Sequence, residues 1–137
     1  MTIEEAKEEL KRYKFDQARI DEAIEDIEAL KERAFKITST LSDMPRGTSP
    51  IQDKKAEIVA KYVDKANEMA ILNSEMMEKQ KKIESKILKI QQPYQNILYF
   101  TYQKGMNLTQ VASKIGYEYI YTTELHGKAL KLYAELE

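Results

Sequence analysis

The chain has 137 residues, with 22 lysines plus arginines against 23 aspartates plus glutamates, one histidine and no cysteine. The lack of cysteine excludes disulfides, thiolate-metal sites and cysteine nucleophiles. A single histidine argues against a His-rich metal cluster and against a Ser-His-Asp triad. We therefore expect no cofactor and no metal, and no enzyme activity, because no site combines a base, a nucleophile and an oxyanion donor.

Membrane insertion and secretion are also not expected. No apolar run approaches the roughly 20 residues of a membrane span. The first five residues lack the basic start and apolar stretch of a secretory signal. Charged residues make up 33% of the chain and glycine plus proline only seven residues, which predicts long, solvated helices. The composition indicates an all-α, cytoplasmic protein.

The first predicted helix runs from about Thr2 to Ile37. Thr2 and Glu5 fit a capping box, in which each side chain satisfies the exposed backbone amide of the other residue. Apolar residues then recur at spacings of three, four and seven, which places them on one face of a helix. This expected stripe consists of Leu10, Tyr13, Ile20, Ile24, Ile27, Ala34 and Ile37.

The second predicted helix runs from about Gln52 to Gln91 and has a similar stripe. Its apolar members are Val59, Tyr62, Ala66, Met69, Met76, Ile83, Ile87 and Ile90. Asn73 and Gln80 fall in the same register. Either they set the register of a buried seam, or the helix rotates slightly and both side chains face water.

A loop is predicted between the two helices, over residues 38–50. Pro45, Gly47 and Pro50 lie there among Ser, Thr and Asp residues, which compete for backbone hydrogen bonds. The helices should fold back as a long antiparallel hairpin over residues 1–92. Two helices bury only one seam, so we expect this hairpin to form a homo-oligomer or to pack against the C-terminal third.

The charge is unevenly distributed along the chain. Residues 1–40 contain 11 acidic and 8 basic residues, whereas residues 51–92 contain 7 acidic and 9 basic residues. The local concentration of lysine between Lys79 and Lys89 is either a solvated face or a contact for phosphate. Residues 93–137 contain four of each sign, so this last segment is neutral.

The last 45 residues, 93–137, predict a domain of shorter helices. The end of the second long helix should pack on this domain. Pro93 suits the first turn of a helix that would end at Gly105. Asn107 and Gln110 form a second capping-box pattern, which begins a helix from Leu108 to Ile115. After Gly116 a final helix is expected from near Glu118 to about Leu136.

This arrangement predicts a helix-turn-helix. Ala112 is small enough for two helices to cross closely, and Gly116, four residues later, permits a left-handed turn. Apolar residues stand where the two helices should pack together, at Val111, Ile115, Tyr117 and Leu125. Thr122 takes an inner position where an aliphatic side chain is expected.

The stretch from Tyr102 to Tyr117 resembles region 4 of sigma-70-type factors, and the stretch from Leu125 to Leu130 continues that resemblance. With the Leu41–Gly47 loop and the helical N-terminal part, the whole chain is similar to the ArpU/RinA-type late transcription regulators of phages and prophages. The resemblance implies a DNA-binding regulator, which also contacts RNA polymerase if it acts as sigma region 4 does.

The exposed face of the second helix of the motif should contact DNA. The candidate DNA-binding residues are Thr109, Gln110, Lys114, Glu118, Tyr119, Ile120, Thr123 and Lys128. This face has no arginine, so Lys104, Lys114, Lys128 and Lys131 would have to neutralise phosphates. The alternative is a protein-interaction module that binds RNA polymerase or a phage protein without contacting DNA.

Overall fold

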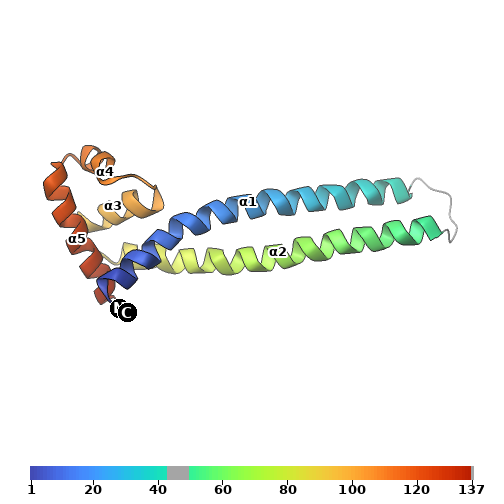
Figure 1. The fold of residues 1–137 in the computed structure, drawn as a ribbon, viewed down its shortest axis with the longest axis horizontal. Helices are drawn as coiled ribbons and strands as arrows, with labels where there is room; N and C mark the ends of the chain where they lie inside the picture. The colour runs from blue at the N-terminus through green and yellow to red at the C-terminus, as the bar shows by residue number, and fades with distance from the viewer. Residues whose placement is uncertain (43–49, 137) are drawn as a thin grey trace. The chain divides into compact units, whose positions relative to one another are not determined.

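The computed structural model describes residues 1–42 and 50–136, and the side chains of residues 1–39 and 53–136. All its regular elements are helices, as the composition predicts. The Met44–Gly47 part of the predicted loop lies outside the described residues. Helix α1 (Ile3–Ser42) and helix α2 (Pro50–Leu88) lie side by side and antiparallel (Figure 1), which confirms the predicted hairpin.

Helix α1 begins where the sequence predicts and ends later. The Thr2 hydroxyl accepts a hydrogen bond from the backbone N–H of Glu5 at 3.1 Å, which caps the first turn. The helix continues through residues 38–42, for which the sequence predicts a loop. Thr38 does not interrupt it, because the Thr38 hydroxyl donates to the backbone carbonyl of Ala34 at 2.8 Å, within the helix.

Shorter helices follow in the C-terminal third. They are α3 (Tyr94–Leu98), the π-helical segment η1 (Tyr99–Gln103), α4 (Leu108–Ile115) and α5 (Tyr119–Glu135). The single helix predicted between Pro93 and Gly105 is thus an α-helical turn followed by a π-helical one. In η1 the N–H of Lys104 donates to the carbonyl of Tyr99, five residues earlier, at 3.1 Å.

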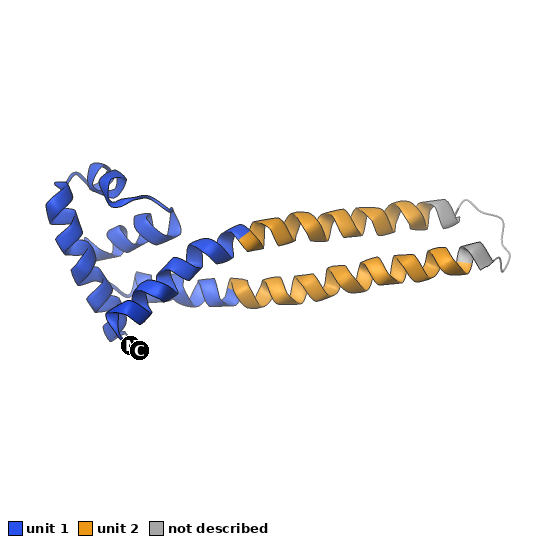
Figure 2. Cartoon of the chain, viewed as in Figure 1, with its two compact units in different colours: residues 1–18, 78–137 blue, residues 19–77 orange. Residues whose placement is uncertain are grey.

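The chain forms two compact units, and both long helices contribute to each (Figure 2). Unit 1 comprises residues 1–18 and 78–137, and unit 2 comprises residues 19–77. In unit 1, the N-terminal part of α1 and the C-terminal part of α2 share a hydrophobic core with the shorter helices. Its buried members include Leu10, Ile87, Leu98 and Tyr133.

Polar contacts connect α1 to α2 inside unit 1. The buried Gln80 side chain donates from Nε2 to the backbone carbonyl of Tyr13 at 3.1 Å. The Tyr13 hydroxyl donates to Glu84 Oε1 at 2.6 Å. Lys86 Nζ lies 3.3 Å from Glu9 Oε2. Gln80 therefore belongs to the seam and does not face water.

In unit 2 the seam follows a seven-residue period on both helices. Ile20, Ile27 and Ala34 are buried on α1, and Ala66 and Asn73 are buried on α2. Asn73 is only 6% exposed, so it too lies in the seam. Ile24 was predicted to belong to this stripe but is 42% exposed, because it lies beside the line of contact between the helices.

Candidate nucleic-acid interface

Helix α4 begins with the capping box predicted at Asn107. The Asn107 side chain accepts a hydrogen bond from the backbone N–H of Gln110 at 2.8 Å. The Gln110 side chain in turn accepts one from the N–H of Asn107 at 3.1 Å. The two bonds satisfy amides that a helix N-terminus leaves unpaired, and they fix the start of the helix.

The turn between α4 and α5 depends on Gly116. This residue is left-handed, with φ +80° and ψ 27°, as the sequence predicts. The N–H groups of Gly116 and Tyr117 both donate to the carbonyl of Ala112, at 2.9 and 3.0 Å. The turn thereby ends α4 and lets the chain start α5 three residues later.

A small core sets α5 against α4 and α3. Ile97 and Val111 are fully buried there with Leu125, and Ala112 is 4% exposed. Thr122 is fully buried at an inner position. Its hydroxyl donates to the carbonyl of Glu118 at 2.9 Å, so burial of this polar group leaves no unpaired donor. The hydroxyl oxygen thus takes the place of a methyl group in this core.

Tyr117 does not pack between the helices as predicted. It is 42% exposed, and its ring makes an edge contact with the ring of Tyr121 at a centroid distance of 5.3 Å. The chain changes direction at Gly116, so the next side chain leaves the α4 face and joins the outer surface of α5. Tyr119 and Ile120 are exposed as well, and we call these four residues around the start of α5 the α5 aromatic patch.

All eight candidate DNA-binding residues have exposed side chains. They occupy α4 (Thr109, Gln110, Lys114) and the residue before α5 or α5 itself (Glu118, Tyr119, Ile120, Thr123, Lys128). Two of them already use part of their hydrogen-bonding capacity. The Gln110 carbonyl oxygen is in the capping box, and the Thr123 hydroxyl donates to the carbonyl of Tyr119 at 2.9 Å. Thr123 therefore offers a ligand its methyl group and the hydroxyl oxygen as an acceptor, but no free hydroxyl donor.

The electrostatics of this surface are mixed. Glu118, the residue before α5, and Glu124, in its second turn, are both exposed. Lys114, Lys128 and Lys131 are exposed, whereas Lys104 Nζ lies over the ring of Tyr99 at 5.6 Å from its centroid. Three lysines can thus contact phosphates without giving up an aromatic contact. Because this number is small, the sequence-independent part of any DNA affinity should be limited.

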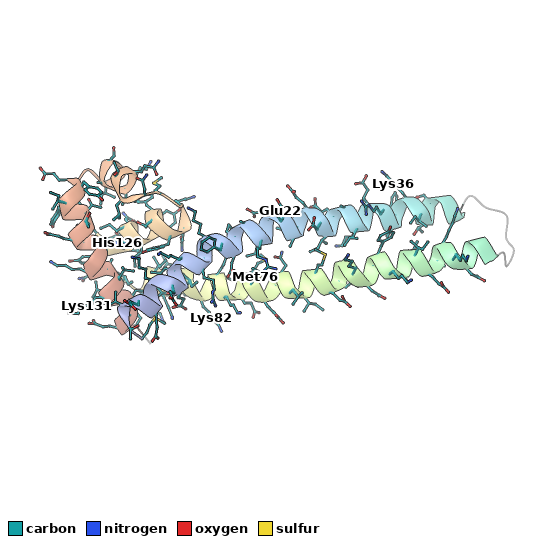
Figure 3. The ribbon with its side chains drawn as sticks, in the orientation of Figure 1. Glu22, Lys36, Met76, Lys82, His126 and Lys131 are labelled. Atoms are coloured by element: carbon teal, nitrogen blue, oxygen red, sulfur yellow. The ribbon has the colours of Figure 1, made fainter. Side chains whose placement is uncertain are left out.

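His126 lies in α5 (Figure 3) and is half-buried. Its Nε2 is 2.8 Å from the hydroxyl of Tyr102 in η1, and the two rings stack at 5.7 Å. Burial lowers the pKa of His126, and the positive charge of Lys7 adds to this effect. Burial also raises the pKa of Tyr102 to about 12. The pair thus helps to hold α5 against η1 as two neutral groups.

The seven C-terminal tyrosines divide between core and surface. Tyr102 and Tyr133 are buried, Tyr94 and Tyr99 are half-buried, and the remaining three belong to the exposed aromatic patch. The sequence predicts the exposure of Tyr119 and Ile120 but not that of Tyr117 and Tyr121, because spacing alone does not distinguish the outer face of a short helix from its inner face when aromatic residues lie on both.

In the described part of the chain, no group of three His, Asp or Glu side chains could hold a metal ion. None of the described helices is long and apolar enough to cross a membrane. No family model, curated protein or solved structure matches this chain.

Proposed function

We propose that this protein is a phage-type transcriptional regulator that binds duplex DNA with the exposed face of α5. The observation that carries the proposal is the α4–Gly116–α5 arrangement, with a left-handed glycine, a buried Ala112 in α4 and exposed side chains on the first turns of α5. Two helices in this relation can place the second one in the major groove while the first crosses the backbone. The proposal includes a non-enzymatic, cytoplasmic role.

The chemistry of α5 favours base contacts over strong phosphate contacts. Ile120 can meet the methyl group of thymine, and Glu118 and Glu124 can accept hydrogen bonds from the amino group of cytosine. With three lysines available, the dependence of log K on log salt should have a slope of about −3 or shallower for each protein chain. The affinity should therefore come mainly from base contacts and from the presence of more than one chain on the DNA.

The test is binding of the purified full chain to its own upstream DNA and to a randomised duplex library, at low and at moderate salt. The full chain is required because Leu10 and Ile87 complete the core against which the shorter helices pack. We expect the protein to select a defined sequence. Ile120→Ala should bind that sequence more weakly, and Lys114→Ala should reduce the slope of log K against log salt by about one. Absence of any complex with micromolar protein at low salt would refute the proposal.

A second candidate is a protein-interaction module that binds RNA polymerase or a phage protein. The α5 aromatic patch and the two nearby carboxylates favour it, because exposed tyrosine and isoleucine side chains are common at protein interfaces and carboxylates repel DNA phosphates. Capture of RNA polymerase that survives nuclease treatment and is lost with Tyr119→Ser would support this candidate. Retention of polymerase by that variant would exclude the patch as the contact.

A further inference from the structure

Helix α2 has a second seven-residue pattern, beside the seam that it forms with α1. Between residues 56 and 77 the spacings alternate between four and three, and every position is uncharged. These residues, which we call the α2 strip, are Ala56, Ala60, Val63, Asn67, Ala70, Ser74 and Met77. All are exposed except the half-buried Ala70, and Val63 and Met77 are each 41% exposed. An uncharged strip with this spacing is typical of a helix that packs against two partners.

Few side chains of the unit 2 seam are fully buried, and Val59, Tyr62, Met69 and Met76 of α2 are only half-buried. Among the described side chains of residues 19–77, the buried ones are two isoleucines, two alanines and Asn73. In the same residues, seven large apolar side chains are exposed: Ile24, Phe35, Ile58, Val63, Ile71, Leu72 and Met77. Since most helical stability in proteins comes from packing of an apolar face, burial of further apolar surface would stabilise this section.

The order of side chains in the α2 strip fits a second copy of the same strip. If two α2 helices run antiparallel about a two-fold axis at Asn67, Ala60 of one copy lies opposite Ser74 of the other. Among the residues of the α2 strip, Val63 then lies nearest to Ala70 of the other copy and Met77 nearest to Ala56, each pair one residue out of exact register. Each larger side chain meets a smaller one, and Asn67 meets its own copy, whose amide can both donate and accept.

We propose that two copies of this chain pair through their α2 strips, antiparallel and with Asn67 at the symmetry axis. The pairing turns two hairpins into a four-helix arrangement and covers Val63 and Met77 of both copies. A polar asparagine at one position of an otherwise apolar seam fixes the register of the helices. The inference depends on unit 2 alone and holds whether or not α5 binds DNA.

The mass of the protein in solution tests the pairing. Light scattering after gel filtration of the full chain should give twice the chain mass of 16.0 kDa. Val63→Glu should return the mass to that of a single chain, because two carboxylates would be buried opposite alanine. Leu72→Glu is the matched control, since Leu72 is exposed on the side of α2 away from the strip and its substitution should leave the dimer intact.

Helical content measured by circular dichroism separates loss of pairing from loss of folding in both variants. A single-chain mass for the unmodified protein at tens of micromolar would overturn the proposal. So would a dimer that Val63→Glu leaves unchanged, or a protein that pairs only with a different polypeptide.

The register can be tested with cysteine, because the natural chain has none. Asn67→Cys should form an intermolecular disulfide under mild oxidation, whereas Glu68→Cys, one residue further round the helix, should not. Val63→Cys should link to Ala70→Cys in a mixed sample and much more slowly to itself. Equal rates for positions 67 and 68, or preferred self-linkage at Val63, would refute the antiparallel register.

Discussion

Two glycines in the helix-turn-helix should respond in opposite ways to the same substitution. Gly116 is left-handed, and a Cβ built on it meets nothing within 4 Å. Gly127 lies inside α5, and a Cβ built there also meets nothing within 4 Å. Steric clashes are therefore absent at both positions, and only the backbone preference of alanine remains to determine the effect.

The magnitudes follow from that preference. Gly116→Ala forces an L side chain into the left-handed region, which costs about 1–2 kcal/mol. Gly127→Ala removes glycine from a helix interior and should stabilise by about 0.5–1 kcal/mol. The two variants should therefore differ by about 2 kcal/mol in the free energy of unfolding, on opposite sides of the unmodified protein.

Urea unfolding followed by circular dichroism at 222 nm measures both changes, and Gly116→Asn gives a control. Asparagine tolerates the left-handed region better than alanine, so it should recover part of the stability lost at position 116. Equal destabilisation by alanine at both glycines would refute the reasoning. It would mean that another group packs closely against Gly127, although no atom lies within 4 Å of a Cβ built at this position.

Three further outcomes are expected. Because the pKa of His126 is lowered in the folded protein, the folded state binds fewer protons than the unfolded state as pH falls below about 6.5, so stability should decrease there; His126→Phe should remove this slope, and an unchanged slope would contradict the assignment. Gln80→Ala removes the bond to the Tyr13 carbonyl and leaves a void in the seam, which should cost about 1–3 kcal/mol in urea unfolding, while Lys81→Ala on the exposed face should cost under about 0.5 kcal/mol. If Ile120 contacts a thymine methyl, replacing thymine by uracil in a selected DNA site should weaken binding by the unmodified protein and leave Ile120→Ala unaffected; equal losses for both proteins would exclude that contact.

The long helices could be predicted from sequence because periodicity, caps and the lack of glycine and proline all agree over many turns. The same is true of the turn at Gly116 and the capping box at Asn107, where one residue type has one geometric role. The burial of Gln80 could not be decided in this way. A glutamine at a seam position is satisfied either by water or by a backbone carbonyl, and the carbonyl of Tyr13 is known only once α1 has been placed beside α2.

On the surface of α5, too, some features are predictable from the sequence and others are not. The exposed positions of the candidate residues within α5 follow from the helical period once Thr122 and Leu125 are assigned to the core. The outward position of Tyr117 does not, because it depends on the direction in which the chain leaves Gly116. The π-helical geometry of η1 was likewise missed, since no signal between Pro93 and Gly105 distinguishes it from an ordinary helix.

The core of unit 1 joins the two ends of the chain, and this affects the order in which the protein can fold during synthesis. Leu10 and Tyr133 belong to the same core although 122 residues of chain lie between them. Closing so long a loop directly costs more entropy than closing a short one. If α1 and α2 pair progressively as α2 is synthesised, Tyr13 contacts Glu84 before the last helix has been made. The N-terminal segment is then already in place when that helix leaves the ribosome. Pairing of the long helices would thus bring residues that are far apart in the sequence close together in space before the final core contact forms.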